Sequence, residues 1–128
     1  MLKRFDEFGR DFLETVGHRR TREAALRCAT CSAVISHRPR PIERRGAHRH
    51  HFVNPHGFSF HVGCFAHAER TAGSGRATSA HTWFPGYAWR IALCAGCGVH
   101  VGWRFDGPHD SFFALILSRV IEAPGDDH

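Results

Sequence analysis

Four of the five cysteines form two C-x-x-C pairs, Cys28 with Cys31 and Cys94 with Cys97. Each pair can occupy two corners of a tetrahedron, and four thiolates together fill the coordination sphere of a structural zinc ion. A closed site of this kind leaves no position for a water molecule, so its metal stabilises the fold and takes no part in catalysis. The spacing therefore predicts one structural Zn²⁺ per chain, bound by these four cysteines, in preference to disulfides.

The three tryptophans, Trp83, Trp89 and Trp103, all lie within 21 residues of one another. No Asp or Glu occurs between Glu69 and Asp106, whereas several arginines do. An aromatic cage for a cation would have the wrong charge around it here. The alternative, three tryptophans in the core, would leave three indole N–H groups in need of buried partners. The pattern therefore favours a pocket for a flat, neutral ligand that carries carbonyl groups.

The composition indicates one globular domain of 128 residues with a formal net charge of +5, from 17 Lys+Arg and 12 Asp+Glu. The arginines follow no repeating spacing, which does not favour nucleic-acid binding. No apolar run approaches the ~20 residues of a membrane span, and charges interrupt the N-terminus, unlike a secretory signal. Cysteines in C-x-x-C pairs indicate metal binding in a reducing compartment, so we expect a cytoplasmic protein.

The chain divides into a short extension, one domain and a tail. Residues 2–16 place apolar side chains at a spacing of three to four, which predicts an amphipathic helix within an N-terminal helical extension at 1–20. The domain is expected to span 21–124. Residues 125–128 are expected to form a frayed tail.

Strands must position the cysteines and tryptophans. Ala33–Ile35 is expected to follow the first cysteine pair as a strand, which gives a strand–knuckle–strand unit. Residues 58–62 and 99–105 alternate apolar with other side chains, as half-buried strands do. Asn54–Gly57 and 106–108 are predicted turns.

The remaining segments carry weaker signals. Thr71–Ala80 is rich in small residues and is predicted to be a loop, and the charged stretch that ends at His51 is also expected to be loop-like. The run His48–His51 lies beside arginines that disfavour a bound dication, so we interpret it as exposed chain. Phe112–Ile121 is apolar enough for one final core strand. Cys64 has no second cysteine nearby and is expected to be a small buried side chain.

With these residues located, the chain resembles the CULT domain, the thalidomide-binding domain found in cereblon and in small single-domain bacterial proteins. The resemblance covers roughly residues 24–122. It rests on C-A-T-C at 28–31, F-V-N-P-H-G at 52–57, F-H-V-G-C-F at 60–65, H-T-W-F-P-G-Y-A-W at 81–89, C-A-G-C at 94–97 and H-V-G-W-R-F at 100–105.

The resemblance implies a mainly β fold, a β-tent in which two antiparallel sheets meet at an angle and are pinned by the zinc site. It also implies a small pocket with Trp83, Trp89 and Trp103 as walls and Phe105 at its base. The ligands of the family are cyclic imides, such as glutarimide and thalidomide-like compounds, and uracil-like rings.

The resemblance further implies which groups of the pocket form hydrogen bonds with an imide. The backbone carbonyl of His81 would accept the imide N–H, while the His81 side chain and the Trp83 backbone N–H would donate to the flanking carbonyls. Asn54 and Pro55 would border the mouth, with His56 nearby. The implied ligand-binding set is Asn54, Pro55, Phe60, His81, Thr82, Trp83, Trp89, Trp103 and Phe105.

Unlike cereblon, the protein is expected to have no Lon-like domain and no ubiquitin-ligase adaptor region, and Ala80 stands where cereblon has an acid. We therefore expect a binding module without catalytic residues, for cyclic imides, uracil-like rings or protein C-termini that have cyclised. The alternative is a methionine sulfoxide reductase-like enzyme on the same β-tent architecture, with Cys64 as its thiol. An imide hydrolase is not favoured, because the expected pocket has no carboxylate base and no open metal.

Overall fold

The computed structural model describes residues 24–124, so the predicted N-terminal helix and the tail at 125–128 lie outside the described residues. Regular structure within 24–124 is mainly β. It comprises β1 (Ala24–Cys28), β2 (Val34–Ser36), β3 (Arg49–Val53), β4 (Ser59–Phe65), β5 (Thr71–Thr78), β6 (Ala88–Cys94), β7 (His100–Asp106), β8 (Ser111–Ile116), the 3-10 turn η1 (Leu117–Arg119) and β9 (Val120–Pro124).

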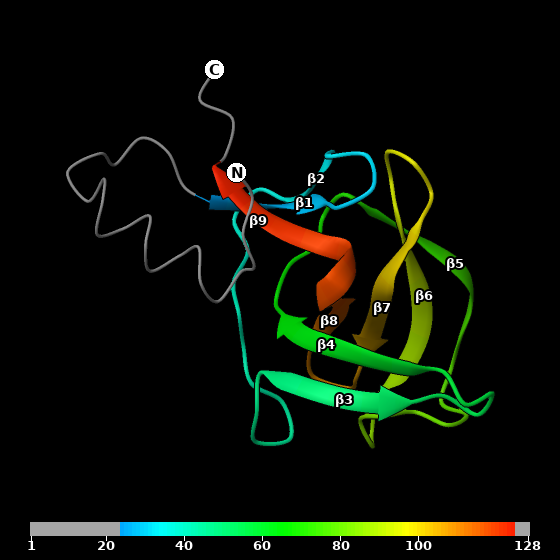
Figure 1. Cartoon of the computed structure of the whole chain (residues 1–128). Helices are drawn as coiled ribbons and strands as arrows, with labels where there is room; N and C mark the ends of the chain where they lie inside the picture. Colours follow the sequence, from blue (N-terminus) through cyan, green and yellow to red (C-terminus); the bar gives the residue numbers. More distant parts are fainter. Residues whose placement is uncertain (1–23, 125–128) are drawn as a thin grey trace.

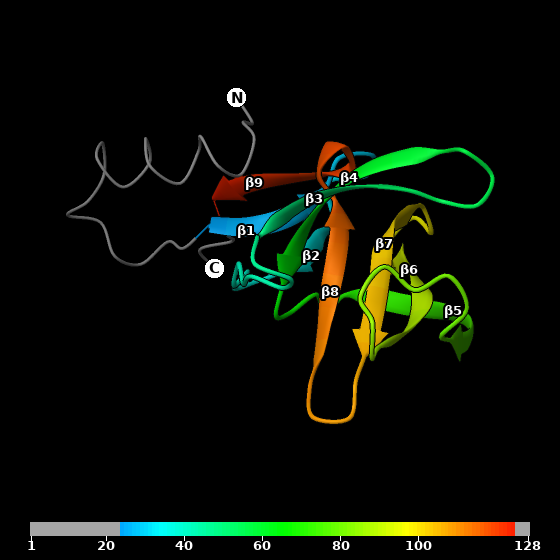
Figure 2. The same cartoon turned by 90° about the horizontal axis from the view of Figure 1, so that it is seen from below.

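The strands form two antiparallel sheets, as predicted (Figure 1). A small sheet has the order β2-β1-β9, and a larger one has the order β3-β4-β8-β7-β6-β5. Figure 2 shows β1 and β9 running across the direction of β7 and β8, so the two sheets meet at an angle. In the part of the chain that the structure describes, no helix has the length and apolarity needed to cross a membrane.

The predicted strand–knuckle–strand unit is confirmed in β1 and β2. These strands pair antiparallel, and the turn between them is closed by hydrogen bonds from Cys28 N–H to the Ala33 carbonyl at 2.8 Å and from Ser32 N–H to the Cys28 carbonyl at 2.8 Å. Ser32 adopts a φ of 69°, which non-glycine residues reach mainly in tight turns. The turn therefore holds the first C-x-x-C pair at the end of the small sheet.

The predicted turn at Asn54–Gly57 is also confirmed and joins β3 to β4. The side-chain oxygen Oδ1 of Asn54 accepts hydrogen bonds from the backbone N–H groups of His56 and Phe58, both at 2.9 Å. Gly57 has a φ of 91°, a conformation that suits glycine. The Asn54 side chain thus stabilises this turn.

Two clusters of buried side chains support the sheets. The first lies where the two sheets meet, and the second lies on the larger sheet beneath the tryptophans. Members of the first include Leu26, Ile35, Phe65, Val101 and Leu115. Members of the second include Val62, Cys64, Phe84, Trp103, Phe105 and Phe112.

The prediction of a loop over Thr71–Ala80 is wrong, because Thr71–Thr78 is the edge strand β5. Most of its residues are exposed, so it shows no apolar alternation that a sequence pattern could reveal. Pairing with β6 supplies the structure instead. An added Cβ at Gly73 would lie 2.7 Å from Cδ of Arg90, so that side chain would have to move. The loop prediction up to His51 is also wrong at its end, because Arg49–Val53 forms the other edge strand, β3.

The prediction of one strand over Phe112–Ile121 is also wrong. The segment forms β8, the turn η1 and the start of β9, and these two strands belong to different sheets. Both strands face buried clusters, so the sequence stays apolar across η1. The break between the two strands therefore leaves no signal in the sequence. This change of sheet brings the end of the domain back onto β1.

Candidate functional site

The structure brings the four predicted metal ligands together. Cys28 ends β1 and Cys94 ends β6, while Cys31 and Cys97 lie in the turns that follow. All four Sγ atoms lie within 4.8 Å of one another. The Sγ atoms of Cys28 and Cys97 are 3.8 Å apart, and those of Cys31 and Cys94 are 3.7 Å apart. Four thiols converging in this way form a metal site that ties the two sheets together.

Backbone N–H groups surround the sulfur atoms. Gly96 N–H points at Cys94 Sγ at 3.3 Å. Burial acts to raise the pKa of Cys94, but hydrogen bonds from the Cys97 and Gly96 N–H groups and from neighbouring thiols outweigh it and lower that pKa from 9.0 to about 7. The pKa of Cys31, which shares these hydrogen bonds, is raised instead. The Cys94 thiolate is therefore stabilised near neutral pH, as a metal ligand requires. Among the described residues, this is the one group of histidine, cysteine and acidic side chains that can hold a metal ion.

A second feature is a cavity of about 490 Å³ beside the tryptophans. Every member of the predicted ligand-binding set except Thr82 lines it. Ile91 and His100 also line it and were not predicted, and His56 lies among the lining residues. The lining comprises Asn54, Pro55, His56, Phe60, His81, Trp83, Trp89, Ile91, His100, Trp103 and Phe105.

The cavity walls are aromatic rings set at steep angles. The rings of Trp83 and Trp103 have centroids 4.7 Å apart with planes at 73°, and Phe60 meets Trp103 edge-on at 5.1 Å. His100 meets Trp103 edge-on at 4.7 Å. Trp103 is only 7% exposed and belongs to the core, whereas Trp83 and Trp89 are half-buried. The tryptophans therefore serve both as core and as cavity wall.

Residues 79–83 form the turn that carries the rim of the cavity. His81 has a φ of 57° in this turn. The indole Nε1 of Trp89 donates to the Ala80 carbonyl at 2.8 Å, which satisfies that N–H group. Thr82 N–H donates to the Ser79 carbonyl at 3.3 Å, and the Thr82 hydroxyl lies 3.3 Å from the Phe84 carbonyl. Thr82 thus supports the turn rather than lining the cavity.

Two backbone groups of this turn bear on binding at the rim. Within residues 24–124, neither the His81 carbonyl nor the Trp83 backbone N–H has a hydrogen-bond partner. The Trp83 carbonyl, by contrast, accepts from Nη1 of Arg45 at 2.8 Å. One acceptor and one donor are therefore available at the rim, and the loop that carries them is anchored from the side.

The cavity carries little charge. No Asp or Glu belongs to the part of its lining that the structure describes. Burial lowers the pKa of His100, and the nearby positive charge of Arg119 acts in the same direction against the hydrogen bond at the Gly102 carbonyl, so the neutral ring is favoured. These surroundings suit a neutral ligand with polar edges.

Cys64 lies in the core, as predicted. It is 0% exposed and packs in the cluster that contains Phe84 and Phe112. Burial raises the pKa of its thiol from 9.0 to about 11. A redox nucleophile needs an exposed thiol of lowered pKa, so the structure offers no support for the reductase alternative.

The histidines of His48–His51 differ from one another. His48 and His50 are half-buried, and their ring nitrogens lie against backbone carbonyls, His48 Nδ1 at 3.0 Å from Ile42 and His50 Nε2 at 2.8 Å from Arg44. His51 is exposed and stacks on His61 with centroids 4.3 Å apart. The expectation of an exposed tract is therefore wrong for His48 and His50, because both rings are turned toward backbone carbonyls.

Comparisons with known proteins find cereblon from several animals. The chain is 48% identical to protein cereblon of Gallus gallus over 81 residues, which is 56% of this chain and 18% of the relative. It is 44% identical to that of Danio rerio over 54 residues, 42% of this chain and 12% of the relative. It is 44% identical to that of Drosophila melanogaster over 52 residues, 37% of this chain and 9% of the relative. No family model matches the chain.

The chain thus spans at most 18% of the length of these curated relatives. The similarity belongs to one part of cereblon and not to the whole protein. Together with the mainly β fold of two antiparallel sheets and the four-cysteine cluster, these matches show that the chain carries a cereblon-like (CULT) domain.

Proposed function

We propose that this domain is a zinc-stabilised binding module that recognises cyclic imides and uracil-like rings in the cavity walled by Trp83, Trp89 and Trp103. The observation that carries the proposal is the rim of that cavity. A carbonyl acceptor at His81 and an N–H donor at Trp83 lie within three residues and have no partner among the described residues. An imide presents acceptor, donor and acceptor along one edge, which complements such a rim.

The shape and polarity of the cavity support a small, flat ring. Ring methylenes or faces can pack on the indoles, and each aromatic contact contributes about 0.5–1.5 kcal/mol beyond the burial of area. Each hydrogen bond contributes a similar net amount. Because association has its own entropic cost, we expect micromolar and not nanomolar dissociation constants. A protein C-terminus that has cyclised to an imide would present the same edge, and we propose it as the macromolecular form of the ligand.

Zinc is the metal that fits the four-cysteine cluster. With Zn–S bonds of about 2.3 Å, neighbouring sulfurs of a tetrahedron lie about 3.8 Å apart. The two measured Sγ–Sγ distances, 3.8 Å and 3.7 Å, agree with that edge. Soft thiolates also select Zn²⁺ over Mg²⁺ or Ca²⁺. The ion would hold the end of β1 against the end of β6, which keeps the small sheet attached to the sheet that bears the cavity.

A titration followed by tryptophan fluorescence tests the proposed ligand class. Uracil, glutarimide, succinimide and hydantoin share the imide-type edge, whereas cyclohexanone and piperidine offer one carbonyl or one amine. We expect the first group to quench or shift the emission saturably, and the second group to have no effect at the same concentrations. Equal responses to both groups would show that the cavity does not read the imide edge.

A further inference from the structure

The hairpin of β3 and β4 extends beyond the rest of the larger sheet. β4 pairs with β3 from Ser59 onward, but its ladder with β8 begins only at Val62 and runs to Phe65. After Ile116 the chain leaves β8 through η1 and enters the other sheet. In residues 24–124, therefore, no strand pairs with the first part of β4 on the side that faces η1.

The backbone of Ser59 points toward this open side. Cys64 N–H donates to the His48 carbonyl, which lies on the β3 side of β4. Residues along an antiparallel strand direct their backbone groups to alternate edges. Ser59 is an odd number of residues from Cys64, so its N–H and carbonyl face away from β3. That open stretch is a sheet edge available for strand addition.

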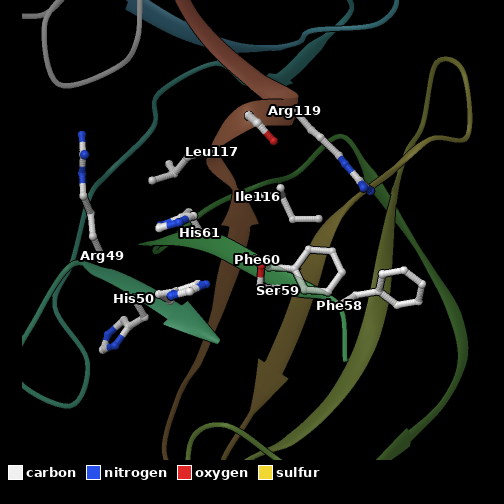
Figure 3. Close-up of a pocket in the computed structure, with 11 residues that line it drawn as sticks. Arg49, His50, Phe58, Ser59, Phe60, His61, Ile116, Leu117 and Arg119 are labelled. Carbon is white, nitrogen blue, oxygen red and sulfur yellow. The ribbon is translucent and has the colours of Figure 1, made fainter. Parts of the chain in front are cut away.

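A groove of about 950 Å³ lies along this edge (Figure 3). Its lining has two arginines and three histidines, and no acidic residue among the part of the chain that the structure describes. The lining comprises Arg49, His50, His51, Phe58, Ser59, Phe60, His61, Ile116, Leu117, Ser118 and Arg119. Arg119 is held in place, since its Nη1 donates to the His100 carbonyl at 2.8 Å and its guanidinium lies 5.9 Å from the Phe60 ring centroid.

We propose that this groove binds an extended acidic peptide, which adds a strand to the open edge of β4. Main-chain pairing with an edge gives affinity for an extended backbone, and the positive lining selects acidic side chains. A second copy of this chain fits less well, because its net charge of +5 would meet a groove of the same sign. Phe60 lines both the groove and the tryptophan cavity, so the two sites are neighbours. The proposal nevertheless does not depend on the ligand of that cavity.

The first test uses fluorescence anisotropy with a short labelled peptide that alternates glutamate with threonine and valine. We expect saturable binding to the 128-residue chain, weakened by salt, and no binding of the matched peptide with lysine in place of glutamate. Two further versions carry backbone N-methyl groups at odd or at even positions. In an added strand, the N–H groups of one set of positions face β4 and those of the other set face away. One methylated version should therefore lose binding, and the other should retain it. Equal binding of all versions would overturn the strand-addition proposal.

The second test changes the edge itself. Ser59→Pro removes the N–H group that faces the groove and leaves the bonds to β3 intact, since proline is tolerated at an open edge. We expect binding to weaken about tenfold, whereas Ser59→Ala, which keeps the N–H, should change it less than about twofold. His61→Glu should weaken binding of the acidic peptide and allow the lysine peptide to bind. Metal content and β-type circular dichroism serve as folding controls, because neither Ser59 nor His61 belongs to the metal cluster.

Three outcomes would overturn the proposal. Unchanged peptide affinity in Ser59→Pro would show that the edge is not used. Inorganic phosphate competing as strongly as the peptide would indicate a simple anion site. A dimer that the peptide displaces, measured by light scattering, would identify the groove as a contact between copies of the chain. Loss of imide binding alone would bear only on the proposed function.

Discussion

Phe52 stacks on Trp83 with ring centroids 4.6 Å apart and ring planes 12° from parallel. Phe52 belongs to β3 and does not line the tryptophan cavity. Arg45 holds the same loop from another direction, through its bond to the Trp83 carbonyl. The tryptophan that forms one cavity wall is therefore fixed by residues behind it, and its position depends on the β3–β4 hairpin.

This relationship predicts that Phe52→Ala weakens imide binding although no direct contact is removed. The stack is worth about 0.5–1.5 kcal/mol, so we expect affinity to fall about fivefold with the metal content unchanged. Phe58→Ala is the matched control, because Phe58 is 65% exposed and lies outside the cavity. Calorimetric titration of both variants with glutarimide measures the effect. Equal affinities would mean that Trp83 is held without the stack.

Removal of the metal should unfold the domain and not merely loosen it. The four thiolates join the end of β1 to the end of β6, so the ion contributes folding free energy directly. We expect one zinc per chain by elemental analysis, and loss of the β-type circular dichroism when a strong chelator is added. Cys94→Ser should show the same loss at expression. A well-folded sample that contains no metal would contradict this role.

Cys64→Ala tests whether the buried thiol has a role beyond packing. Because Cys64 is 0% exposed, the change should cost about 1 kcal/mol of unfolding free energy. Imide binding should remain, because Cys64 does not line the cavity. Urea denaturation and a methionine sulfoxide assay provide the two measurements. A reductase activity present in the parent and lost in the variant would instead favour the enzyme alternative.

Glu122 should make stability depend on pH. It is 5% exposed, its Oε1 has no hydrogen-bond partner among residues 24–124, and burial raises the pKa of its carboxyl from 4.5 to about 7. The folded state therefore holds this proton more tightly than the unfolded state, so stability is greatest below pH 4.5 as far as this group is concerned and falls as the pH rises to about 7. Glu122→Gln should be more stable than the parent by about 2 kcal/mol at pH 8, with no difference near pH 4.

Denaturation curves at several pH values measure this effect. The control is Glu69→Gln, because hydrogen bonds from His37 N–H at 2.9 Å and the Ser36 hydroxyl at 3.1 Å outweigh burial and lower the pKa of Glu69. That substitution should destabilise the protein at neutral pH, and its cost should disappear in acid. A parent and Glu122→Gln with parallel pH profiles would rule out the buried carboxyl as the cause.

The metal cluster and the cavity wall could be predicted because each depends on rare residues at fixed spacing. Two C-x-x-C pairs allow few arrangements around one ion, so the meeting of Cys28 and Cys94 followed from chemistry alone. The turn at Asn54 was visible for a similar reason, since an Asn-Pro-His-Gly run has few uses other than a turn. Local signals were sufficient wherever the local chemistry was restrictive.

The features that sequence reasoning missed depend on tertiary pairing. β5 is exposed along most of its length, and only its pairing with β6 makes it a strand. His100 lies in the cavity because β7 turns it toward Trp103, and its type alone does not distinguish it from the other histidines. The break at η1 lies inside a continuous apolar run, since β8 and β9 both face buried clusters. No local pattern encodes these relations.

The proposed recognition depends on the edge of the ligand ring that pairs with the backbone groups of His81 and Trp83. Varying the ligand is cleaner than removing Trp103, whose 7% exposure means that an alanine there would leave a cavity in the core. The most direct measurement compares glutarimide with N-methylglutarimide on the parent protein by tryptophan fluorescence. Methylation removes the donor and leaves the His81 carbonyl unpaired, a cost of about 1–3 kcal/mol before any steric clash. We predict binding of glutarimide and affinity at least about tenfold lower for the methylated compound; equal affinity for the two would contradict the proposed recognition of the imide edge.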